Sequence, residues 1–509
     1  MPTSWANFGV DLHLELAGQR TAGGRRVRAG LETALRDAVR SGRLSPGTRL
    51  PPSRDLAADL GIARNTVAEA YAQLVAEGWC TARTGAGTWV ASRPAVAVAS
   101  SSDSSEIRVP VALPAAGSSV PPDPGRAPRF DLRAGSPAVA MFPRAQWLSA
   151  ARAALQAAPD HLLDYGDPRG LPELRVALAG YLARARGVIT SPDRIVICSG
   201  FAHGLALIAW VLARRGAVAR RGAVARRGAA TIAVEGYGRL AHRQLIEARG
   251  LSAEPLSAEP LPVDDAGAVP VPSVLERASA AALTPAHQFP LGVTLAPERR
   301  TAFTNWAVGT GGLLIEDDYD GEFRYDRQPT GALQALAPEH VIYAGTASKS
   351  LAPGLRLGWL AAPAALTEEL VAAKTSLGAE NGILDQLTLA RLITSGGYDR
   401  QIRQARLVYR RRRDQLIAAL GRHVPDVRLT GIAAGLHAVA TLPDGCDEGD
   451  AVAQAAVHGV AIDRLANYAA AEHSLGPALV IGYSRPADHA YTTAVTRLCA
   501  ALAETSRSG

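Results

Sequence analysis

The sequence contains almost no lysine, although it is rich in positive charge. Lysine and arginine together account for 54 of the 509 residues, but the only lysines are Lys349 and Lys374. An arginine cannot replace an amine that must lose its proton and form an imine with an aldehyde, because its guanidinium stays protonated. Lys349, in GTASKSLAPGLRLGW, is therefore a candidate for imine chemistry. Lys374, in VAAKTSLG, is interpreted as an ordinary surface charge.

Cysteines are scarce, and long apolar runs are missing. The four cysteines have neither paired nor metal-type spacing, which indicates free thiols in a reducing compartment and no cysteine-based metal site. No apolar run approaches the roughly 18 residues that cross a bilayer. The N-terminal residues lack the basic-then-apolar pattern of a signal peptide. We therefore expect a soluble cytoplasmic protein with no membrane partner and no metal.

Aromatic residues are absent from 93–129, a segment rich in serine, proline and alanine. Such a segment cannot bury enough apolar surface to fold by itself, and its prolines keep it extended. We interpret it as a linker between a domain at 1–92 and a larger domain at 130–509.

The net charge of +7 is weak support for nucleic-acid binding, because a local duplication supplies much of it. In the tandem RRGAVA at 214–230, the two extra arginine pairs contribute four of the seven charges. A second tandem, LSAEP, fills 251–260. Neither has the period of about 20–50 residues that solenoid repeats show. We interpret both as extensions of surface loops or helix ends, so DNA binding has to be argued from a motif.

The first domain contains such a motif. Apolar spacing predicts a helix at 31–44, a short helix that Ser53 caps and Gly61 ends, and a second helix that starts at Arg64. Two strand-like runs around the glycine-rich tip at 84–87 predict a hairpin wing, so the order is that of a winged helix-turn-helix. The second helix is expected to read base edges, and the residues around it are expected to contact phosphates or an adjacent groove. The expected DNA contacts are Arg49, Ser53, Arg54, Arg64, Asn65, Thr66, Arg83 and Gly87.

The second domain alternates strand-like and helical segments, which predicts an α/β fold with a mainly parallel sheet. The expected strands are 194–200, 231–237, 281–288, 313–319, 341–349 and 356–363. Several of them end in polar residues, and ligands of such sheets bind at the carboxyl ends of the strands. The residues expected to converge there are Ser199, Gly200, Tyr237, Asp317, Tyr319 and Lys349.

These residue types suit pyridoxal 5′-phosphate (PLP). An aspartate can hold a pyridine nitrogen protonated, a phenol can bind a ring oxygen, and Lys349 can form a Schiff base. Asp317 and Tyr319 are two apart, and therefore lie on one face of a strand. Tyr237 can stack on the ring, and a helix that opens at Ser199-Gly200 can hold the phosphate with its N–H groups. Arg356 is a further phosphate partner, and Thr346 and Ser348 flank the lysine.

Two family resemblances extend this reading. Residues 31–90 resemble the winged helix of GntR-family transcription regulators, most specifically at LSPGTRLPPSRDLAADLGIARNTVAEAYAQL and TGAGTWV. Residues 129–509 resemble fold-type I aminotransferases, and more closely the aminotransferase-like domain of the MocR subfamily of those regulators. The similarity is carried by DYGDPRGLPELR, TPAHQFPLG, IEDDYDGEFRY and GTASKSLAPGLRLGW.

The resemblance implies a role for each matching residue. Lys349 would bind the cofactor aldehyde, Asp317 the ring nitrogen, and Tyr319 the ring oxygen. Tyr237 would stack on the ring, and Ser348 and Arg356 would hold the phosphate. PLP sites of this fold lie at dimer interfaces, so a homodimer is implied, with Tyr165 reaching across it.

The chain also departs from the aminotransferase pattern. Phe289 stands where aminotransferases usually carry an asparagine, and His287 or Gln288 could replace the lost contact. The strand-like segment 479–483 lacks the arginine that grips a substrate carboxylate, which leaves Arg239 and Arg485 as candidates for that role.

We therefore expect a PLP-dependent regulator that binds an operator in double-stranded DNA and senses PLP or a PLP–amine adduct. An amino acid or amine is the expected effector, and genes of PLP biosynthesis or of amine and GABA metabolism are the expected targets. Sustained catalysis is not expected, although a transamination half-reaction is compatible with the site. The alternative is an active aminotransferase with an attached DNA-binding domain.

Overall fold

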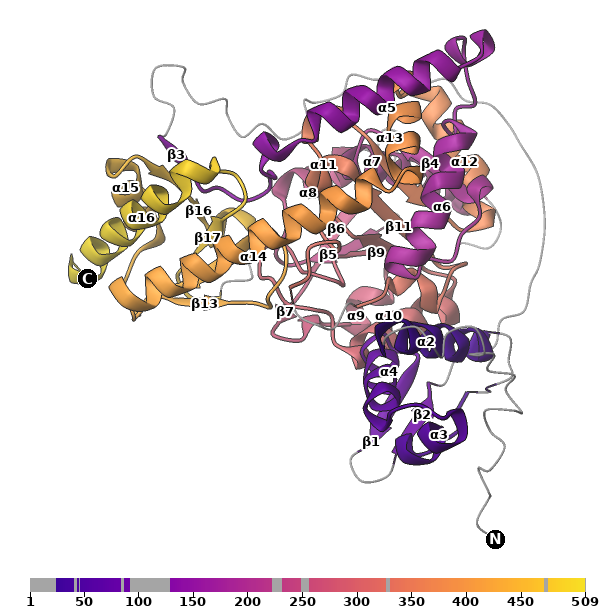
Figure 1. Cartoon of the computed structure of the whole chain (residues 1–509), viewed down its shortest axis with the longest axis horizontal. Helices are drawn as coiled ribbons and strands as arrows, with labels where there is room; N and C mark the ends of the chain where they lie inside the picture. The colour runs from indigo at the N-terminus through magenta and orange to yellow at the C-terminus, as the bar shows by residue number, and fades with distance from the viewer. Residues whose placement is uncertain are drawn as a thin grey trace.

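The computed structural model of the protein describes residues 24–40, 44, 46–83, 87–91, 129–221, 231–248, 256–325, 330–470 and 475–508. Figure 1 shows a small N-terminal domain at one corner of a much larger α/β domain, whose C-terminal part extends to the side. Except for Arg129, the predicted linker 93–129 falls outside the described residues, and so does the wing tip at 84–86.

The N-terminal domain has the winged-helix fold that the sequence predicts. Its elements are α2 (Gly24–Arg40), α3 (Ser53–Leu60), α4 (Arg64–Ala76), β1 (Cys80–Arg83) and β2 (Gly87–Val90). Its core is filled by buried side chains such as Leu31, Leu35, Leu56, Val67 and Leu74. The expectation that Ser53 caps α3 is wrong, because Ser53 is the first helical residue and no side chain bonds the helix start. Gly61 ends α3 in a left-handed conformation (φ 65°), as expected.

The large domain is built on a seven-stranded sheet in the order β4-β12-β11-β10-β9-β5-β6. Its strands are β4 (Ile195–Cys198), β5 (Thr231–Glu235), β6 (Ser257–Leu261), β9 (Ala278–Leu283), β10 (Leu313–Asp317), β11 (Val341–Thr346) and β12 (Gly358–Ala361). Only β12 runs antiparallel to its neighbours, so the predicted mainly parallel α/β fold is confirmed. The inner strands consist almost entirely of buried side chains, as expected of a sheet with both faces covered.

The two tandem repeats differ in their outcome. The prediction for the hexamer is confirmed in its described part, because 214–221 prolong helix α7 (Phe201–Arg221). The prediction for the pentamer is wrong, because its second copy forms most of β6, the edge strand that pairs with β5. Pro260 is tolerated there because an edge strand has one side on which a missing N–H breaks no ladder bond. The rest of both tandems lies outside the described residues.

Helices cover both faces of the sheet. They include α5 (Arg144–Ala157), α6 (Pro172–Arg186), α8 (Leu240–Ala248), α9 (Pro272–Leu275), α10 (Pro297–Thr310), α11 (Ala347–Ser350), α12 (Ala364–Ser376) and α13 (Ile383–Thr394). Short 3-10 turns occur at η1 (Val139–Met141), η2 (Asp160–Leu163), η3 (Pro192–Arg194), η4 (Leu333–Leu336), η5 (Pro353–Leu355) and η6 (Leu465–Tyr468). The interpretation of Lys374 as a surface charge is wrong, because its place in α12 leaves it only 2% exposed. Burial lowers its pKa.

The C-terminal part is a second α/β layer that the long helix α14 (Gly397–His423) joins to the first, as Figure 1 shows. A four-stranded sheet has the order β13-β14-β17-β16, and α15 and α16 pack together beside it. Its elements are β13 (Arg428–Thr430), β14 (His437–Thr441), α15 (Glu448–Val457), β16 (Asp463–Arg464), β17 (Ala478–Gly482) and α16 (Asp488–Ser508). Two small ribbons pair β3 (Phe130–Asp131) with β15 (Val460–Ala461), and β7 (Val263–Asp264) with β8 (Gly267–Ala268). In the described part of the chain, no helix is both long and apolar enough to cross a membrane.

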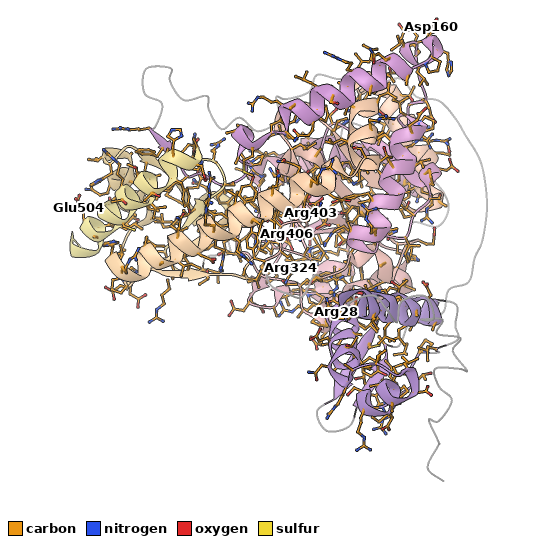
Figure 2. The ribbon with its side chains drawn as sticks, viewed as in Figure 1. Arg28, Asp160, Arg324, Arg403, Arg406 and Glu504 are labelled. Atoms are coloured by element: carbon orange, nitrogen blue, oxygen red, sulfur yellow. The ribbon has the colours of Figure 1, made fainter. Side chains whose placement is uncertain are left out.

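The winged helix packs directly on the large domain. One cluster of buried apolar side chains contains both Leu74 of α4 and Leu336 of η4. Arg300 of α10 has no exposed surface and donates to the carbonyl oxygens of Gly331 (2.8 Å) and Glu77 (3.4 Å). Figure 2 shows Arg28 on the edge of the small domain that faces the large one. The two domains therefore form a continuous buried contact in this state.

Candidate cofactor site and nucleic-acid interface

The carboxyl ends of the central strands surround one cavity. Ser199 and Gly200 follow β4, Tyr237 follows β5, Asp317 ends β10, and Lys349 follows β11. All the residues that the sequence places at these strand ends border the same space, as sheet topology leads one to expect. The predicted residues that line the cavity are Ser199, Gly200, Tyr237, Arg239, Asp317, Tyr319, Thr346, Ser348, Lys349 and Arg356.

Lys349 sits on the single turn α11, with its amine in the cavity. The amine donates a hydrogen bond to the carbonyl oxygen of Gly135. Burial is the main cause that lowers the Lys349 pKa to about 8, the Arg239 guanidinium lowers it further, and Asp317 opposes both. An amine with this pKa has a much larger neutral fraction near neutral pH than an ordinary lysine. A neutral amine is the form that attacks an aldehyde.

Asp317 is the clearest sign that a ligand is expected. Burial raises the pKa of its carboxyl well above the usual range. Among the described residues, its Oδ1 atom is buried and has no hydrogen-bond partner. A buried acceptor without a donor costs about 1–3 kcal/mol, and such groups in native structures call for an explanation. The protonated ring nitrogen of PLP is a donor that would satisfy it.

A cradle for a phosphate lies at the start of α7. The Thr346 and Ser348 hydroxyls are 2.9 Å apart, and the Ser348 N–H donates to Thr346 Oγ1 at 3.1 Å. Gly200 has φ 105°, and a Cβ there would lie 3.9 Å from both hydroxyl oxygens. Arg356 has φ 51°, a left-handed conformation that non-glycine residues seldom adopt outside functional sites. These donors around a helix N-terminus fit a phosphate.

One residue of the cradle is missed by sequence reasoning. Asn381 donates to Ser199 Oγ (3.1 Å) and to the Arg356 carbonyl (3.2 Å). Its own Oδ1 is buried and has no hydrogen-bond partner within the described part of the chain. It lies in the turn before α13, far along the chain from both partners, and no local pattern marks it. The residues present therefore fit PLP at the aldehyde, the ring nitrogen and the phosphate.

Of two further predicted residues, Tyr237 lines the cavity and His287 lies behind its wall. Tyr237 is 2% exposed, and its hydroxyl accepts the Leu475 N–H at 2.5 Å. His287 does not line the cavity, because it lies behind Tyr319, with its Nδ1 3.1 Å from the phenol oxygen. The Gln288 amide faces away, donating to Glu235 (3.1 Å) and to two main-chain carbonyls. Neither His287 nor Gln288 therefore replaces the missing asparagine by direct contact with the cavity.

The two arginines suggested for an effector carboxylate differ in their surroundings. Arg239 lines the cavity, and its guanidinium lies over the Phe289 ring at 4.8 Å. Gly135 has φ 105°, which favours glycine, and a Cβ there would lie 2.1 Å from Arg239 Nη2 and would push the guanidinium aside. Arg485 is instead engaged by Asp131 and by Ser136 Oγ (3.0 Å). Arg239 is therefore the better placed of the two.

The expected DNA contacts lie on the surface of the winged helix. Arg64 and Asn65 are exposed in the first turn of α4, where helix N–H groups and side chains can reach a major groove. Arg54 is exposed at the start of α3, next to half-buried Ser53, and Arg49 lies over the Trp89 ring at 5.5 Å. In Figure 1, α3 and the wing lie on the side of this domain away from the large domain. Thr66 is half-buried, Gly87 begins β2, and Arg83 ends β1.

Tyr165 lies outside the cavity that the other predicted cofactor residues line or adjoin. It is 94% exposed and does not border the cavity of its own chain. Exposed apolar side chains also occur on α5, η2, α6 and the start of α13, namely Leu148, Leu155, Leu163, Val176 and Leu384. Large exposed apolar patches mark interaction sites.

The fold and site define a winged-helix DNA-binding domain fused to an aminotransferase-like domain. The family described as "Bacterial regulatory proteins, gntR family" matches residues 28–90, and "Aminotransferase class I and II" matches residues 284–465. The pyridoxine biosynthesis regulator PdxR of Corynebacterium glutamicum is 32% identical over 411 residues, 80% of this chain and 82% of the relative. The regulator TauR of Rhodobacter capsulatus is 31% identical over 480 residues, 88% of this chain and 93% of the relative. The chain belongs to the MocR-type regulators of the GntR family.

Further relatives agree with both halves of this architecture. The probable rhizopine catabolism regulatory protein MocR of Rhizobium meliloti is 30% identical over 396 residues, 77% of this chain and 76% of that protein. Among solved structures, a multiple substrate aminotransferase of Thermococcus profundus is 26% identical with a TM-score of 0.65, covering 75% of this chain and 92% of that one. A kynurenine aminotransferase of Pyrococcus horikoshii is 25% identical with a TM-score of 0.63, covering 74% and 91%.

Proposed function

We propose that this regulator responds to PLP, or to a PLP–amine adduct, by changing its affinity for an operator. When bound, PLP supplies the aldehyde that Lys349 captures. Asp317 would hold the ring nitrogen through its unpartnered Oδ1, and Arg356 with Ser348 would hold the phosphate. Arg239 would bind the carboxylate of an amino-acid effector.

The observation that carries the proposal is the position of strand β10. Successive side chains of a strand point to opposite faces, so Asp317 faces the cavity while its neighbour Glu316 faces away. The Glu316 carboxylate accepts the N–H groups of Leu333 (2.7 Å) and Gln334 (2.8 Å). One strand therefore touches both the cofactor cavity and the segment 330–337.

The same segment, 330–337, also contacts the winged helix. A Cβ at Gly331 would lie 3.1 Å from the Glu77 carboxyl carbon, and a Cβ at Gly78 would lie 3.1 Å from Leu336 Cδ1. The Glu77 carboxylate is held in place by Arg36 through bonds of 2.7 and 2.8 Å. A shift of β10 on cofactor binding would therefore reach the docked winged helix, because the backbone at Gly331 and Gly78 lies against side chains of the other domain. Allosteric coupling requires such a differential contact, since a flexible linker alone transmits little.

We also infer that the protein acts as a homodimer. Tyr165 and several apolar side chains of α5, η2, α6 and α13 are exposed in a single chain, and a second copy would cover them. The partner's loop would then bring its tyrosine to the rim of the cavity. Sedimentation velocity tests this: a dimer that Leu148→Asp dissociates is expected, and a monomeric wild type would contradict it.

The target genes follow from the relatives only as a proposal. One relative is named for pyridoxine biosynthesis and another for rhizopine catabolism. We infer that this protein controls genes of PLP biosynthesis or of amine metabolism. Footprinting on the DNA upstream of its own gene and of such genes would identify the operator.

The test of PLP sensing is a pair of titrations. PLP is added to cofactor-free protein with and without operator DNA, and its absorption band reports binding. Reciprocity requires operator to change PLP affinity by the same factor, about 5–150-fold for typical coupling, as PLP changes operator affinity. Identical curves, together with footprints that do not depend on PLP, would contradict the proposal.

An active aminotransferase is the second candidate, favoured by the lowered Lys349 pKa of about 8. Two features disfavour it: Phe289 stands in place of an amide side chain, and residues 478–482 contain no arginine. Steady-state turnover with a panel of amino acids would establish it, whereas a single turnover without cycling would support the sensor.

A further inference from the structure

A buried pair of side chains behind the cavity has no role in the proposal so far. His287 and Asp320 are 3% and 2% exposed. His287 Nδ1 lies 2.9 Å from Asp320 Oδ2 and 3.1 Å from the Tyr319 hydroxyl oxygen. Of the three residues, only Tyr319 borders the cavity. The imidazole is therefore shared between a carboxylate and the phenol that faces the cofactor site.

The pair decides where the Tyr319 proton points. A ring nitrogen carries either one hydrogen or one lone pair. Beside an ionised Asp320, Nδ1 of His287 carries the hydrogen and donates it to the carboxylate, which fixes the tautomer. Such an Nδ1 has no lone pair left to accept the phenol proton. Tyr319 can then only accept from His287, and its own proton is free for the cavity.

The rest of this wall offers no competing donor. Phe289 stands edge-on to Tyr319, with ring centroids 5.8 Å apart. His437 Nε2 lies 3.0 Å from the Pro290 carbonyl oxygen. Because a carbonyl oxygen can only accept, Nε2 carries the single N–H hydrogen of the neutral imidazole. Burial, and after it the proximity of His287, lower the His437 pKa well below the usual value. Of the described residues Phe289, Tyr319 and His437, only Tyr319 has a proton to donate into the cavity.

The backbone seals the pair from water. Gly435 has φ 73°, and a Cβ there would lie 2.2 Å from His287 Cε1 and 2.6 Å from Asp320 Oδ2. The Gly435 carbonyl accepts the Tyr483 hydroxyl at 2.9 Å, which holds this turn in place. Exclusion of water strengthens the bond between His287 and Asp320 and keeps one tautomer.

We propose that Asp320, acting through His287, is a positioning residue that keeps the Tyr319 hydroxyl as a donor to the ring oxygen of PLP. This device compensates for the amide that Phe289 lacks, and it rests on the proposal that the cavity binds PLP. Asp320 and His287 touch neither the cofactor nor the effector.

The test is a double-mutant cycle in the full-length protein, read by PLP affinity and by the absorption spectrum of the bound cofactor, without DNA. Tyr319→Phe removes the donor. Asp320→Ala frees Nδ1 to accept the phenol proton and so turns the donor away. Each change is expected to weaken PLP binding by about tenfold or more, the value of a hydrogen bond to a charged group, with the same spectral change. The double variant should be no weaker than Tyr319→Phe.

Two further variants separate positioning from a structural role. Asp320→Asn keeps an oxygen that accepts from Nδ1 and is expected to restore the wild-type affinity and spectrum. His287→Leu removes the competing acceptor, so it should also retain both, and it decides the question if Asp320→Ala does not fold. Additive losses in the cycle, or a tenfold loss in His287→Leu with normal thermal unfolding, would overturn this inference alone. A wild type that binds no PLP would overturn the proposed function as well.

Discussion

Replacing Arg300 by alanine should uncouple the winged helix from the cofactor cavity while leaving PLP binding intact. Arg300 is fully buried and does not line the cavity. It donates to Gly331 within the large domain and to Glu77 of the winged helix across the domain contact. Loss of the guanidinium leaves the Gly331 carbonyl buried without its 2.8 Å partner. Such an unsatisfied group costs about 1–3 kcal/mol, and the longer bond to Glu77 adds about 0.5–1 kcal/mol. The docked state should therefore weaken by about 1.5–4 kcal/mol.

That loss is as large as a typical allosteric coupling of 1–3 kcal/mol. The effect of PLP on operator affinity should therefore shrink toward none, while the PLP band and its midpoint without DNA stay unchanged. Arg299→Ala is the matched control, because Arg299 is the preceding residue of α10 and forms an ion pair with Asp264 (2.6 Å) at the surface. An exposed pair is worth about 0–1 kcal/mol. The reasoning would be refuted if PLP still changed the operator affinity of Arg300→Ala by the wild-type factor while limited proteolysis showed that the winged helix had been released from the large domain.

Three other changes test the site, the DNA interface and the repeats. Lys349→Ala should abolish the covalent attachment of PLP that borohydride reduction fixes, whereas Lys374→Ala should retain it. In the wild type, this attachment should increase as pH rises through about 8, because the neutral Lys349 amine is the reactive form. Arg64→Ala should reduce discrimination between operator and random DNA by about 1–3 kcal/mol, whereas Arg49→Ala should weaken both equally and lower the salt dependence, as measured by fluorescence anisotropy. Deletion of residues 256–260 should leave the thermal unfolding midpoint nearly unchanged, because the remaining LSAEP copy has the same sequence and can form β6; deletion of 220–225 should likewise leave both the midpoint and the salt slope of DNA binding unchanged.

The sequence predicts those parts of the site that depend on local periodicity. Asp317 and Tyr319 are recognisable because a buried apolar strand ends just before them, and the carboxyl ends of parallel strands meet at one edge. Lys349 is recognisable because the chain uses arginine for almost every other positive charge. The winged helix is predictable because Gly61 and the wing glycines mark each change of direction.

Other features depend on contacts between distant segments, which no local pattern reveals. Asn381 joins the phosphate cradle across 182 residues from Ser199. Lys374 is buried because α12 packs its lysine face toward the sheet, although its short local sequence reads as a surface helix. The second LSAEP copy becomes a strand because β5 offers it an edge, despite a proline and a glutamate that disfavour strands.

The choice between a sensor and an enzyme depends on which cofactor-binding and substrate-binding groups the cavity has. A sensor has to hold the cofactor, and the groups proposed to hold it line the cavity: Lys349, the unpartnered Asp317 oxygen, and the hydroxyl cradle beside Arg356. An aminotransferase must also bind its substrates in one fixed geometry and release the products in every cycle. The segment 478–482 offers only aliphatic side chains and glycine for this purpose, and Arg485 is already paired with Asp131. The cavity wall also holds Arg239, which lies over the apolar Phe289 ring, and Arg243, whose guanidinium donates to the Glu235 and Gly236 carbonyl oxygens. Arg239 can therefore bind an anionic effector, but without the paired grip that repeated turnover needs.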